Sequence, residues 1–490
     1  EAFHRVPCSP AREKAQYLDL QNDVTVADLR VAIAEGFTDI EHAKRYTTLG
    51  IGTDQGRAGG VLGAAVLAEL LGKAPQVART SRARPPLASI PLAQIAGRRV
   101  GSAFRVLRQT PLHAEHLAAG GVMDPMGLWL RPRYYRANGA DAGTAAPVEA
   151  ARVRAAGGIV DCSTLGKLEV AGPDAAAFLD EIYLTRVSSL RVGRSSYRVM
   201  LREDGMVLDD GLVLRLADDR YFLTTSSGHG LHVLSHLEHH LAGHTAHRRV
   251  AITDCTDRSA VIAVAGPQSA ATLRAALPEL IDPVAALAPM AFCDVPHPEG
   301  ALRLLRAGFS GELGYELYCP PARAANVWRQ LVAFGMQPYG LDALDILRVE
   351  KGLLTTSEIT GQVTPFDLGM EAMVAQGNDC IGRSLLDRPA FHEPNRPRLV
   401  GLQSADGRSP FLAGAQLTTT ANGTLPAGYV TSAVFSPALG QTVALALLSR
   451  DVSFGAVVHA RDPLRGASTP VKVVSPVHFD PQGLRVKGQP

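Results

Sequence analysis

Apolar residues near the amino end of the chain recur at helical spacing. Val26 and Leu29 follow residues that commonly cap a helix, and a second such run begins at Thr38. A third run covers Val61–Leu71, after a glycine-rich stretch. Three short runs of this kind predict a small helical module, to which we assign residues 1–80.

A proline-rich stretch follows this module. Lys73–Arg99 contains four prolines among serine, arginine and alanine. Proline lacks a backbone N–H and cannot continue a helix. The pattern therefore predicts a linker over residues 81–104.

The central region contains an internal repeat. LEVAGPDAAAFL at Leu168–Leu179 resembles IAVAGPQSAATL at Ile262–Leu273. In each copy an apolar strand meets Gly-Pro and then a helix, with the proline expected in the first helical turn. Further strands are expected at Arg194–Leu201, Gly211–Leu216 and Arg220–Thr225. We interpret residues 105–392 as an α+β core of two similar halves, although two unrelated strand–turn–helix units would give the same pattern.

The sequence pattern changes again from about Leu399. Short β-rich runs follow one another closely: VGLQS, GAQLTT, GYVTSAVF, TVALALL, VVHARD and VKVVSPVHF. Glycine, proline, asparagine and aspartate separate them. Short strands at this spacing predict a small β-barrel over residues 393–490.

Composition narrows the possible partners. The 490 residues are 46% hydrophobic and 20% charged, and the formal net charge is +2. This is an ordinary globular composition, which excludes a disordered chain, and it offers no electrostatic case for binding nucleic acid or a membrane surface. The six cysteines form no C-x-x-C pair, so we expect no disulfide framework and a reducing, cytoplasmic compartment.

Two neighbouring carboxylates are candidates for chemistry. Asp209 and Asp210 stand side by side between two apolar stretches. Adjacent strand residues face opposite sides, so at most one of them can enter a given pocket. A carboxylate held near a developing positive charge can stabilise it or accept a proton. The alternative is a hairpin in which the two residues cap a turn.

A second candidate lies in AGFSGELGYELY. Glu316 enters a strand after a loop whose glycines, Gly308, Gly311 and Gly314, would let backbone approach a flat ligand. A buried Glu316 would need hydrogen-bond donors, and a heterocycle with an amino group beside a ring N–H supplies two. A surface glutamate at a strand end is the alternative.

The histidine-rich segment GHGLHVLSHLEHHLAGHTAH raises the question of metal. His232, His236 and His240 have the i, i+4, i+8 spacing of one helix face. No cysteine or second acidic ligand completes a site, and a leucine stripe marks the opposite face as the buried one. We therefore interpret the segment as a solvated helix and expect no metal site.

Long ordered motifs identify a family. They are TPLHAEHLAAGGVMDPMGLWLRPRYY, GIVDCSTLGKLEVAGPDAAAFL, SSYRVMLREDGMVLDDGLV, FSGELGYEL, LDALDILRVEKG, VTPFDLGM and GYVTSAVFSPALGQTVALALL. In this order they resemble the aminomethyltransferase (T-protein) family of folate enzymes. The segments MLREDGMVLDDG and FSGELGYE are most similar to the C-terminal half of the alpha subunits of heterotetrameric sarcosine oxidases.

The resemblance implies a tetrahydrofolate site in the central region. Asp210 matches the catalytic aspartate near the reactive folate nitrogens, and Glu316 matches the glutamate that holds the pterin. Arg348 suits the glutamyl tail or its amide end. The folate-binding positions are Glu316, Tyr197, Arg348, Phe309 and Asp209, with phenylalanine at 309 where tyrosine is common.

The first module resembles helical modules that bind a [2Fe–2S] cluster through four cysteines. This chain has no cysteine at the matching positions, where Asp19, Gln21, Leu49 and Asp54 stand instead. Without thiolates it cannot hold the cluster, so a scaffolding role is expected.

The resemblance further implies an oxidoreductase subunit that makes glycine and 5,10-methylenetetrahydrofolate from sarcosine, with hydrogen peroxide from a flavin half-reaction. FAD, FMN and NAD belong to the full complex and are not expected on this chain. The expected partners are a flavin-bearing beta subunit and small gamma and delta subunits. No G-x-G-x-x-G signal is present and residue 1 is Glu1, from which we expect part of a longer polypeptide.

Three alternatives stay open. A glycine-cleavage aminomethyltransferase would share the core but would not need residues 1–100. A folate-dependent iron–sulfur maintenance protein would carry K-G-C-Y-x-G-Q-E where this chain reads EKGLLTTSEIT. A non-catalytic folate-binding scaffold is the third, because Thr356 and Ser357 replace the family's usual Gly-Gln-like pair and leave the amine substrate open.

Overall fold

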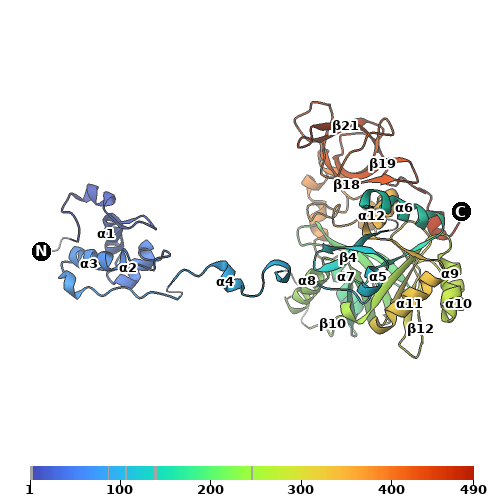
Figure 1. Ribbon diagram of the computed structural model, residues 1–490, viewed down its shortest axis with the longest axis horizontal. Coiled ribbons are helices and arrows are strands. Elements are labelled where there is room, and N and C mark those ends of the chain that lie inside the picture. Colours follow the sequence, from blue (N-terminus) through green and yellow to red (C-terminus); the bar gives the residue numbers. More distant parts are fainter. Residues whose placement is uncertain (1–3, 86–87, 105–106, 137–140, 244–246, 490) are drawn as a thin grey trace. The chain divides into compact units, whose positions relative to one another are not determined.

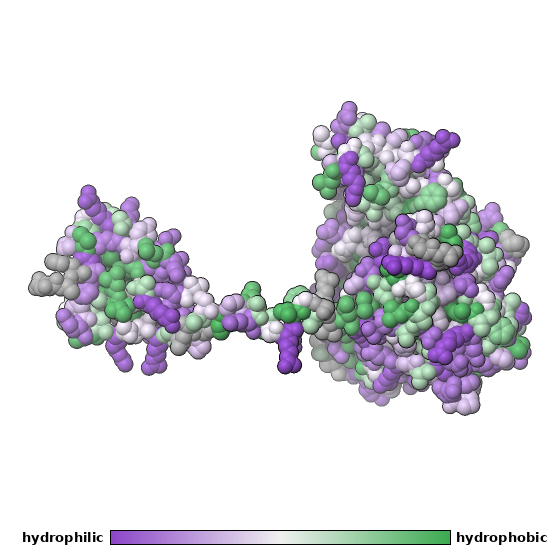
Figure 2. Space-filling model, in the orientation of Figure 1, coloured by the Kyte–Doolittle hydropathy of each residue, from purple (hydrophilic) through white to green (hydrophobic). Residues whose placement is uncertain are grey.

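A computed structural model describes residues 4–85, 88–104, 107–136, 141–243 and 247–489. The chain divides into two units, Glu1–Val106 and Leu107–Pro490. We describe each unit separately. On the visible face of each, hydrophilic and hydrophobic residues are interspersed (Figure 2).

Three helices supply most of the apolar core of the first unit, as predicted. They are α1 (Val26–Ala34), α2 (Ile40–Thr47) and α3 (Gly60–Leu70). A two-stranded hairpin, β1 (Tyr17–Asp19) and β2 (Val24–Thr25), precedes them. Thr25 caps α1 and exchanges hydrogen bonds with Asp28, whose Oδ2 accepts from the Thr25 N–H at 2.7 Å.

The proline-rich stretch is not wholly irregular. Leu92–Ala96 forms the short helix α4, which the sequence analysis did not predict. It begins directly after Pro91 and ends at Gly97, whose φ is +58°. Proline before the first turn and glycine after the last one delimit this single helical turn.

The second unit contains two sheets of similar strand order, which differ in that β5 stands between β11 and β15 in the second sheet. In the first sheet, the strands lie in the order β10-β6-β9-β8-β7. Along the chain, strand β6 is followed by a helix and then by the three antiparallel strands β7, β8 and β9. In the second, the order is β12-β13-β14-β11-β5-β15, and β11 and its successors repeat the same pattern. The sequence repeat therefore marks two similar α+β halves, as predicted. The first half contains β6 (Gly166–Ala171), α7 (Ala175–Ile182), β7 (Ser195–Leu201), β8 (Val207–Ala217), β9 (Arg220–Thr225), α8 (Gly230–Gly243) and β10 (Ala251–Asp254). The second contains β11 (Ala260–Ala265), α9 (Ser269–Ala276), α10 (Ile281–Ala286), β12 (Phe292–Val295), β13 (Leu302–Leu305), β14 (Gly314–Cys319), α11 (Pro321–Ala333) and β15 (Gln337–Pro338), with β5 (Gly158–Asp161) joining its sheet.

The Gly-Pro pair in each copy of the repeat makes the turn between strand and helix. Gly172 and Gly266 have φ values of +134° and +114°, which L side chains rarely adopt. A Cβ on Gly172 would lie 2.1 Å from the Arg249 carbonyl oxygen. The prolines stand just before the helix caps rather than in the first helical turn, because α7 begins only at Ala175 and α9 only at Ser269.

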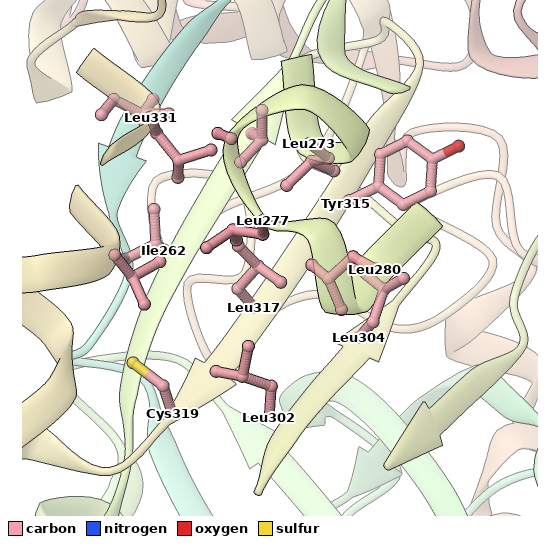
Figure 3. Packing of buried hydrophobic residues seen from close by; sticks show 14 of the residues in the cluster. Ile262, Leu273, Leu277, Leu280, Leu302, Leu304, Tyr315, Leu317, Cys319 and Leu331 are labelled. Atoms are coloured by element: carbon pink, nitrogen blue, oxygen red, sulfur yellow. The ribbon is translucent and has the colours of Figure 1, made fainter. Parts of the chain in front are cut away.

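Each half buries its own apolar core. In the second half, Leu273 of α9 and Leu331 of α11 pack with Ile262 and Leu317 of the sheet (Figure 3). A third cluster joins the two sheets, with Leu214 and Phe222 from the first sheet and Leu305, Val261 and Tyr318 from the second. The candidate residues Asp210 and Glu316, described below, lie on the faces of the two sheets that meet at this cluster.

The remaining helices and strands cover these sheets. They are α5 (His113–Ala118), β3 (Gly121–Met126), β4 (Trp129–Tyr135), α6 (Ala142–Ala155), α12 (Leu341–Lys351) and α13 (Glu371–Ala375). Among the described residues no helix is long and apolar enough to span a bilayer.

The last six strands close into a barrel, as predicted. Its order is β16-β19-β18-β17-β20-β21. The strands are β16 (Pro397–Ser404), β17 (Gln416–Thr418), β18 (Gly428–Ser436), β19 (Gln441–Ser449), β20 (Val457–Asp462) and β21 (Ala467–Val474). Helix α12 lies between the barrel and the core (Figure 1), and its Val349 packs with Leu399, Val443 and Leu445 of the barrel.

Candidate functional site

The two candidate aspartates lie inside a strand. β8 begins at Val207, earlier than the predicted Gly211, so that Asp209 and Asp210 are strand residues rather than residues between strands. Gly211 follows them where β8 and β9 approach closely, and a Cβ there would lie 1.9 Å from the Thr224 carbonyl oxygen. The glycine lets the strands pair at this point and so fixes the backbone of the carboxylates.

Asp209 and Asp210 face opposite sides of the sheet, as strand alternation requires. Asp210 lies opposite Val199 of β7, and Leu212 and Leu214 share its face. These two leucines pack in the cluster between the sheets. Asp210 therefore points to the interlayer side, whereas Asp209 points to the helical side of the first half.

Tyr197 is the direct partner of Asp210. Its hydroxyl donates to Asp210 Oδ2 at 2.8 Å across β7 and β8. Burial, reinforced by the neighbouring charge of Asp209, raises the pKa of Asp210 from 3.8 to about 6, while the Tyr197 hydrogen bond opposes the rise. A carboxylate whose pKa lies near neutrality can exchange protons at physiological pH.

Asp209 is buried and held by protein atoms. Its Oδ1 lies 3.1 Å from His229 Nδ1, and its Oδ2 accepts from the Ser226 N–H at 3.2 Å. The hydrogen bond to Asp209 raises the pKa of His229. His229 was not predicted as a partner of Asp209, since their 20-residue separation carries no spacing signal.

Glu316 faces the same interlayer from the other sheet. It lies on β14 two residues from Tyr318, on the face of that strand which joins the inter-sheet cluster. The Tyr318 hydroxyl donates to Glu316 Oε2 at 2.7 Å, and burial raises the pKa of Glu316. The residues in the described part of the chain offer no hydrogen bond to its Oε1. This oxygen is therefore available to a hydrogen-bond donor from outside the described residues.

The glycines before Glu316 pack against protein rather than leaving a cradle. Gly308 and Gly314 approach each other, so that a Cβ on Gly308 would lie 3.2 Å from the Gly314 Cα. Gly311 has a φ of +74° and faces Lys351. Phe309 of the same loop is 38% exposed, which leaves its ring accessible.

Arg348 is enclosed in a polar network between α12 and the barrel. Its Nε donates to Asp345 at 2.7 Å, its Nη1 to Glu358 at 2.8 Å and its Nη2 to the Ser432 hydroxyl at 2.5 Å. All three guanidinium nitrogens are thus engaged by the protein.

The two positions that depart from the family pattern, Thr356 and Ser357, lie exposed next to Glu358. The structure thus puts Asp210 and Glu316 on the faces of the two sheets that meet, places the Tyr197 hydroxyl beside Asp210, and places Arg348 in a separate network.

In the first unit, the four positions that the resemblance matches to cluster cysteines make ordinary protein contacts. Asp19 accepts from the Gly50 N–H at 2.7 Å and from the Gln21 N–H at 2.9 Å. Leu49 is buried in the core of this unit, and Asp54 accepts from the Ala58 N–H at 3.0 Å. Within the described ranges, no group of three or more His, Cys, Asp or Glu side chains is placed to hold a metal ion.

Comparison with known proteins agrees with this architecture. The GCVT N-terminal domain matches residues 112–377, and the glycine cleavage T-protein C-terminal barrel domain matches residues 398–480. The sarcosine oxidase A3 domain matches residues 13–98.

The similar individual proteins are sarcosine oxidase alpha subunits and aminomethyltransferases. The chain is 36% identical over 489 residues to sarcosine oxidase subunit alpha of Rhizobium meliloti (strain 1021), covering 97% of this chain and 49% of that protein. It is 30% identical to the aminomethyltransferase of Saccharopolyspora erythraea, covering 75% of this chain and 97% of that protein.

A solved structure extends the agreement. The glycine cleavage system aminomethyltransferase T of Bartonella henselae has a TM-score of 0.67 and 26% identity, and the match covers 76% of this chain and 98% of that one. The chain spans about half the length of the sarcosine oxidase alpha subunits it matches. The aminomethyltransferase fold and the predicted resemblance are thereby confirmed, and the chain belongs to the glycine cleavage T-protein family of aminomethyltransferases.

Proposed function

We propose that this chain is the folate-dependent part of a sarcosine oxidase. In the proposed overall reaction, sarcosine, oxygen and tetrahydrofolate give glycine, hydrogen peroxide and 5,10-methylenetetrahydrofolate. The similarity to sarcosine oxidase alpha subunits over 97% of the chain, including the first unit, supports this choice.

The observation that carries the proposal is the environment of Asp210. Its carboxylate is mostly buried beside the interlayer, bonded by the Tyr197 hydroxyl, and has a pKa of about 6. A desolvated carboxylate stabilises a cationic one-carbon carrier more strongly than one in water, and at this pKa it can also accept a proton. On the opposite face of the sheet, Asp209 accepts a hydrogen bond from the Ser226 N–H, which helps to hold this part of β8, and so Asp210, in place.

Tetrahydrofolate, when bound, supplies the nucleophilic nitrogen that accepts the one-carbon unit. In the proposal, the free oxygen of Glu316 accepts from the pterin, and the exposed ring of Phe309 supplies an apolar wall. Arg348 would act by holding the loop around Glu358 against the barrel, since its nitrogens are engaged there.

The oxidation of the amine is assigned to partners. A flavin-bearing beta subunit, with small gamma and delta subunits, would complete the enzyme, and FAD, FMN and NAD would be bound outside this chain. This chain would then contribute position and electrostatics to the transfer.

Calorimetric titration with tetrahydrofolate tests the proposed function. Wild type should bind it, Glu316→Gln should bind it at least about tenfold more weakly because a charged acceptor is lost, and Glu299→Gln, at an exposed glutamate, should bind as wild type. Absence of tetrahydrofolate binding by wild type would contradict the proposed function and would favour a non-catalytic chain that retains only the fold.

The glycine-cleavage alternative has its own support, because aminomethyltransferases match nearly over their whole length. A requirement for a lipoylated carrier protein in the transfer reaction would favour that alternative. Transfer from oxidised sarcosine without such a carrier would favour the sarcosine oxidase.

A further inference from the structure

A polar pocket opens beside the candidate aspartate. It has a volume of about 360 Å³ and lies between β7, the segment after α7 and helix α13. Tyr197, whose hydroxyl bonds Asp210, forms one wall. The other lining residues are Thr185, Arg186, Ser189, Arg198, Met373 and Gln376. We call it the β7 pocket, and its volume falls in the range of small-molecule sites.

The β7 pocket carries two arginines without matching carboxylates. Arg198 donates to the Ser196 hydroxyl at 2.7 Å and to the carbonyl oxygens of Arg186 and Tyr197 at 3.1 and 3.4 Å. None of these acceptors is charged. In the described part of the chain, no ion pair involves the Arg198 or Arg186 side chain.

The nearest acid is already in use. The Asp180 carboxylate accepts from the Val187 N–H at 2.6 Å and from the Ser188 hydroxyl at 2.5 Å. Its charge favours the ionised form of Arg198, but burial of the guanidinium outweighs this and lowers the pKa of Arg198. Among the residues that the structure describes, no carboxylate is bonded to the half-buried guanidinium of Arg198, so an anionic ligand would supply the charge partner that it lacks.

Two polar atoms in residues lining the pocket lack partners. Among the described residues, Arg198 Nε and Thr185 Oγ1 are buried with no hydrogen-bond partner. Buried donors are nearly always satisfied by protein, water or ligand. Both residues line the β7 pocket, so a ligand that brings acceptor atoms there would give these two groups partners.

We propose that the β7 pocket is a carboxylate subsite for a molecule that reacts at Asp210. The inference rests on the proposed function, which supplies two sources of a carboxylate: the glutamyl end of the folate and the amino acid itself. Arg198 would bind the carboxylate and Arg186 would neutralise it from the rim. Because Arg348 is enclosed elsewhere, these arginines are the better candidates for the anionic tail.

Titration of the full chain with three ligands distinguishes the sources. Tetrahydrofolate carries the glutamyl tail, tetrahydropterin lacks it, and glycine carries the amino-acid carboxylate. The variants are Arg198→Met and Arg186→Met, with Arg198→Lys to retain charge and Arg191→Met as an exposed control in the same segment. Thermal melting of each variant checks that it is folded.

Either of two results supports the subsite. If the glutamyl tail binds there, Arg198→Met weakens the binding of tetrahydrofolate by about tenfold or more and leaves the binding of tetrahydropterin unchanged. Arg198→Lys then recovers part of the lost affinity. If the amino acid binds there, Arg198→Met weakens the binding of glycine and leaves the binding of tetrahydrofolate unchanged. Arg191→Met should behave as wild type in both cases.

The inference is overturned if folded Arg198→Met and Arg186→Met bind tetrahydrofolate and glycine as tightly as wild type. Failure of the proposed function has a different signature, in which wild type binds neither tetrahydropterin nor tetrahydrofolate. The subsite would then be retained only if glycine binds and Arg198→Met weakens it.

Discussion

At the scale of single residues, the candidate chemistry depends on one carboxylate whose ionisation the fold opposes. Alternation along a strand was enough to predict that Asp209 and Asp210 serve different sides. The partners of these groups could not be predicted, because Tyr197 and His229 reach them through the pairing of strands and the docking of a loop. Arg348 shows the same limit, since its enclosure by Glu358 and Ser432 is set by tertiary packing.

Replacing Asp210 should stabilise the protein at high pH. Because its pKa is raised from 3.8 to about 6, the ionised carboxylate destabilises the folded state, and this effect grows from pH 4 to pH 6 and is complete above it. Asp210→Asn should therefore raise the free energy of unfolding by about 1–3 kcal/mol at pH 8 and change it little at pH 4. Urea unfolding at both pH values measures this, and an equal change at both would refute the electrostatic explanation.

Removing the Tyr197 hydroxyl should shift the same titration. The hydrogen bond from Tyr197 lowers the pKa of Asp210, so Tyr197→Phe should raise that pKa and move the acidic limb of the pH–activity profile upward. Transfer at neutral pH should fall by about tenfold, since a bond to a charged group is lost. Tyr221→Phe is the matched control, because the Tyr221 hydroxyl is buried without a partner in the described structure. If the acidic limb of the pH–activity profile stays in place in Tyr197→Phe, the Tyr197 hydroxyl does not set the pKa of Asp210.

At the scale of elements, the repeat and the barrel were predictable because their signals are local. Short apolar runs separated by turn residues gave the six barrel strands, and Gly-Pro marked both strand–helix turns. The start of β8 was not predictable. Its first residues include two aspartates, which have low strand propensity, and pairing with β7 overrides that preference.

Gly211 tests the pairing that fixes the candidate site. Gly211→Ala would bring a Cβ to 1.9 Å from the Thr224 carbonyl oxygen, so β8 and β9 must separate. We expect a loss of about 3 kcal/mol or more in the free energy of unfolding, together with a loss of folate binding. Gly228→Ala, where the Cβ meets open space, should cost less than about 1 kcal/mol. Similar stability of the two variants would show that the close approach is dispensable.

At the scale of the whole molecule, an aminomethyltransferase core and barrel share the chain with a first unit that has a different relative. The core and the barrel match aminomethyltransferases, and the first unit matches the sarcosine oxidase A3 domain. In the first unit, Asp19 accepts hydrogen bonds from the Gly50 N–H and the Gln21 N–H. The combination of matches supports the proposal that the chain carries out one-carbon transfer and that partner subunits oxidise the amine.

The central claim is tested most directly by following the carbon of ¹³C-methyl sarcosine in the complex that contains this chain. With wild type, the label should appear in 5,10-methylenetetrahydrofolate. With Asp210→Asn, that product should fall by about a hundredfold while hydrogen peroxide forms at the wild-type rate and the label appears as free formaldehyde. A parallel loss of peroxide and folate product, or undiminished transfer in the variant, would contradict the account.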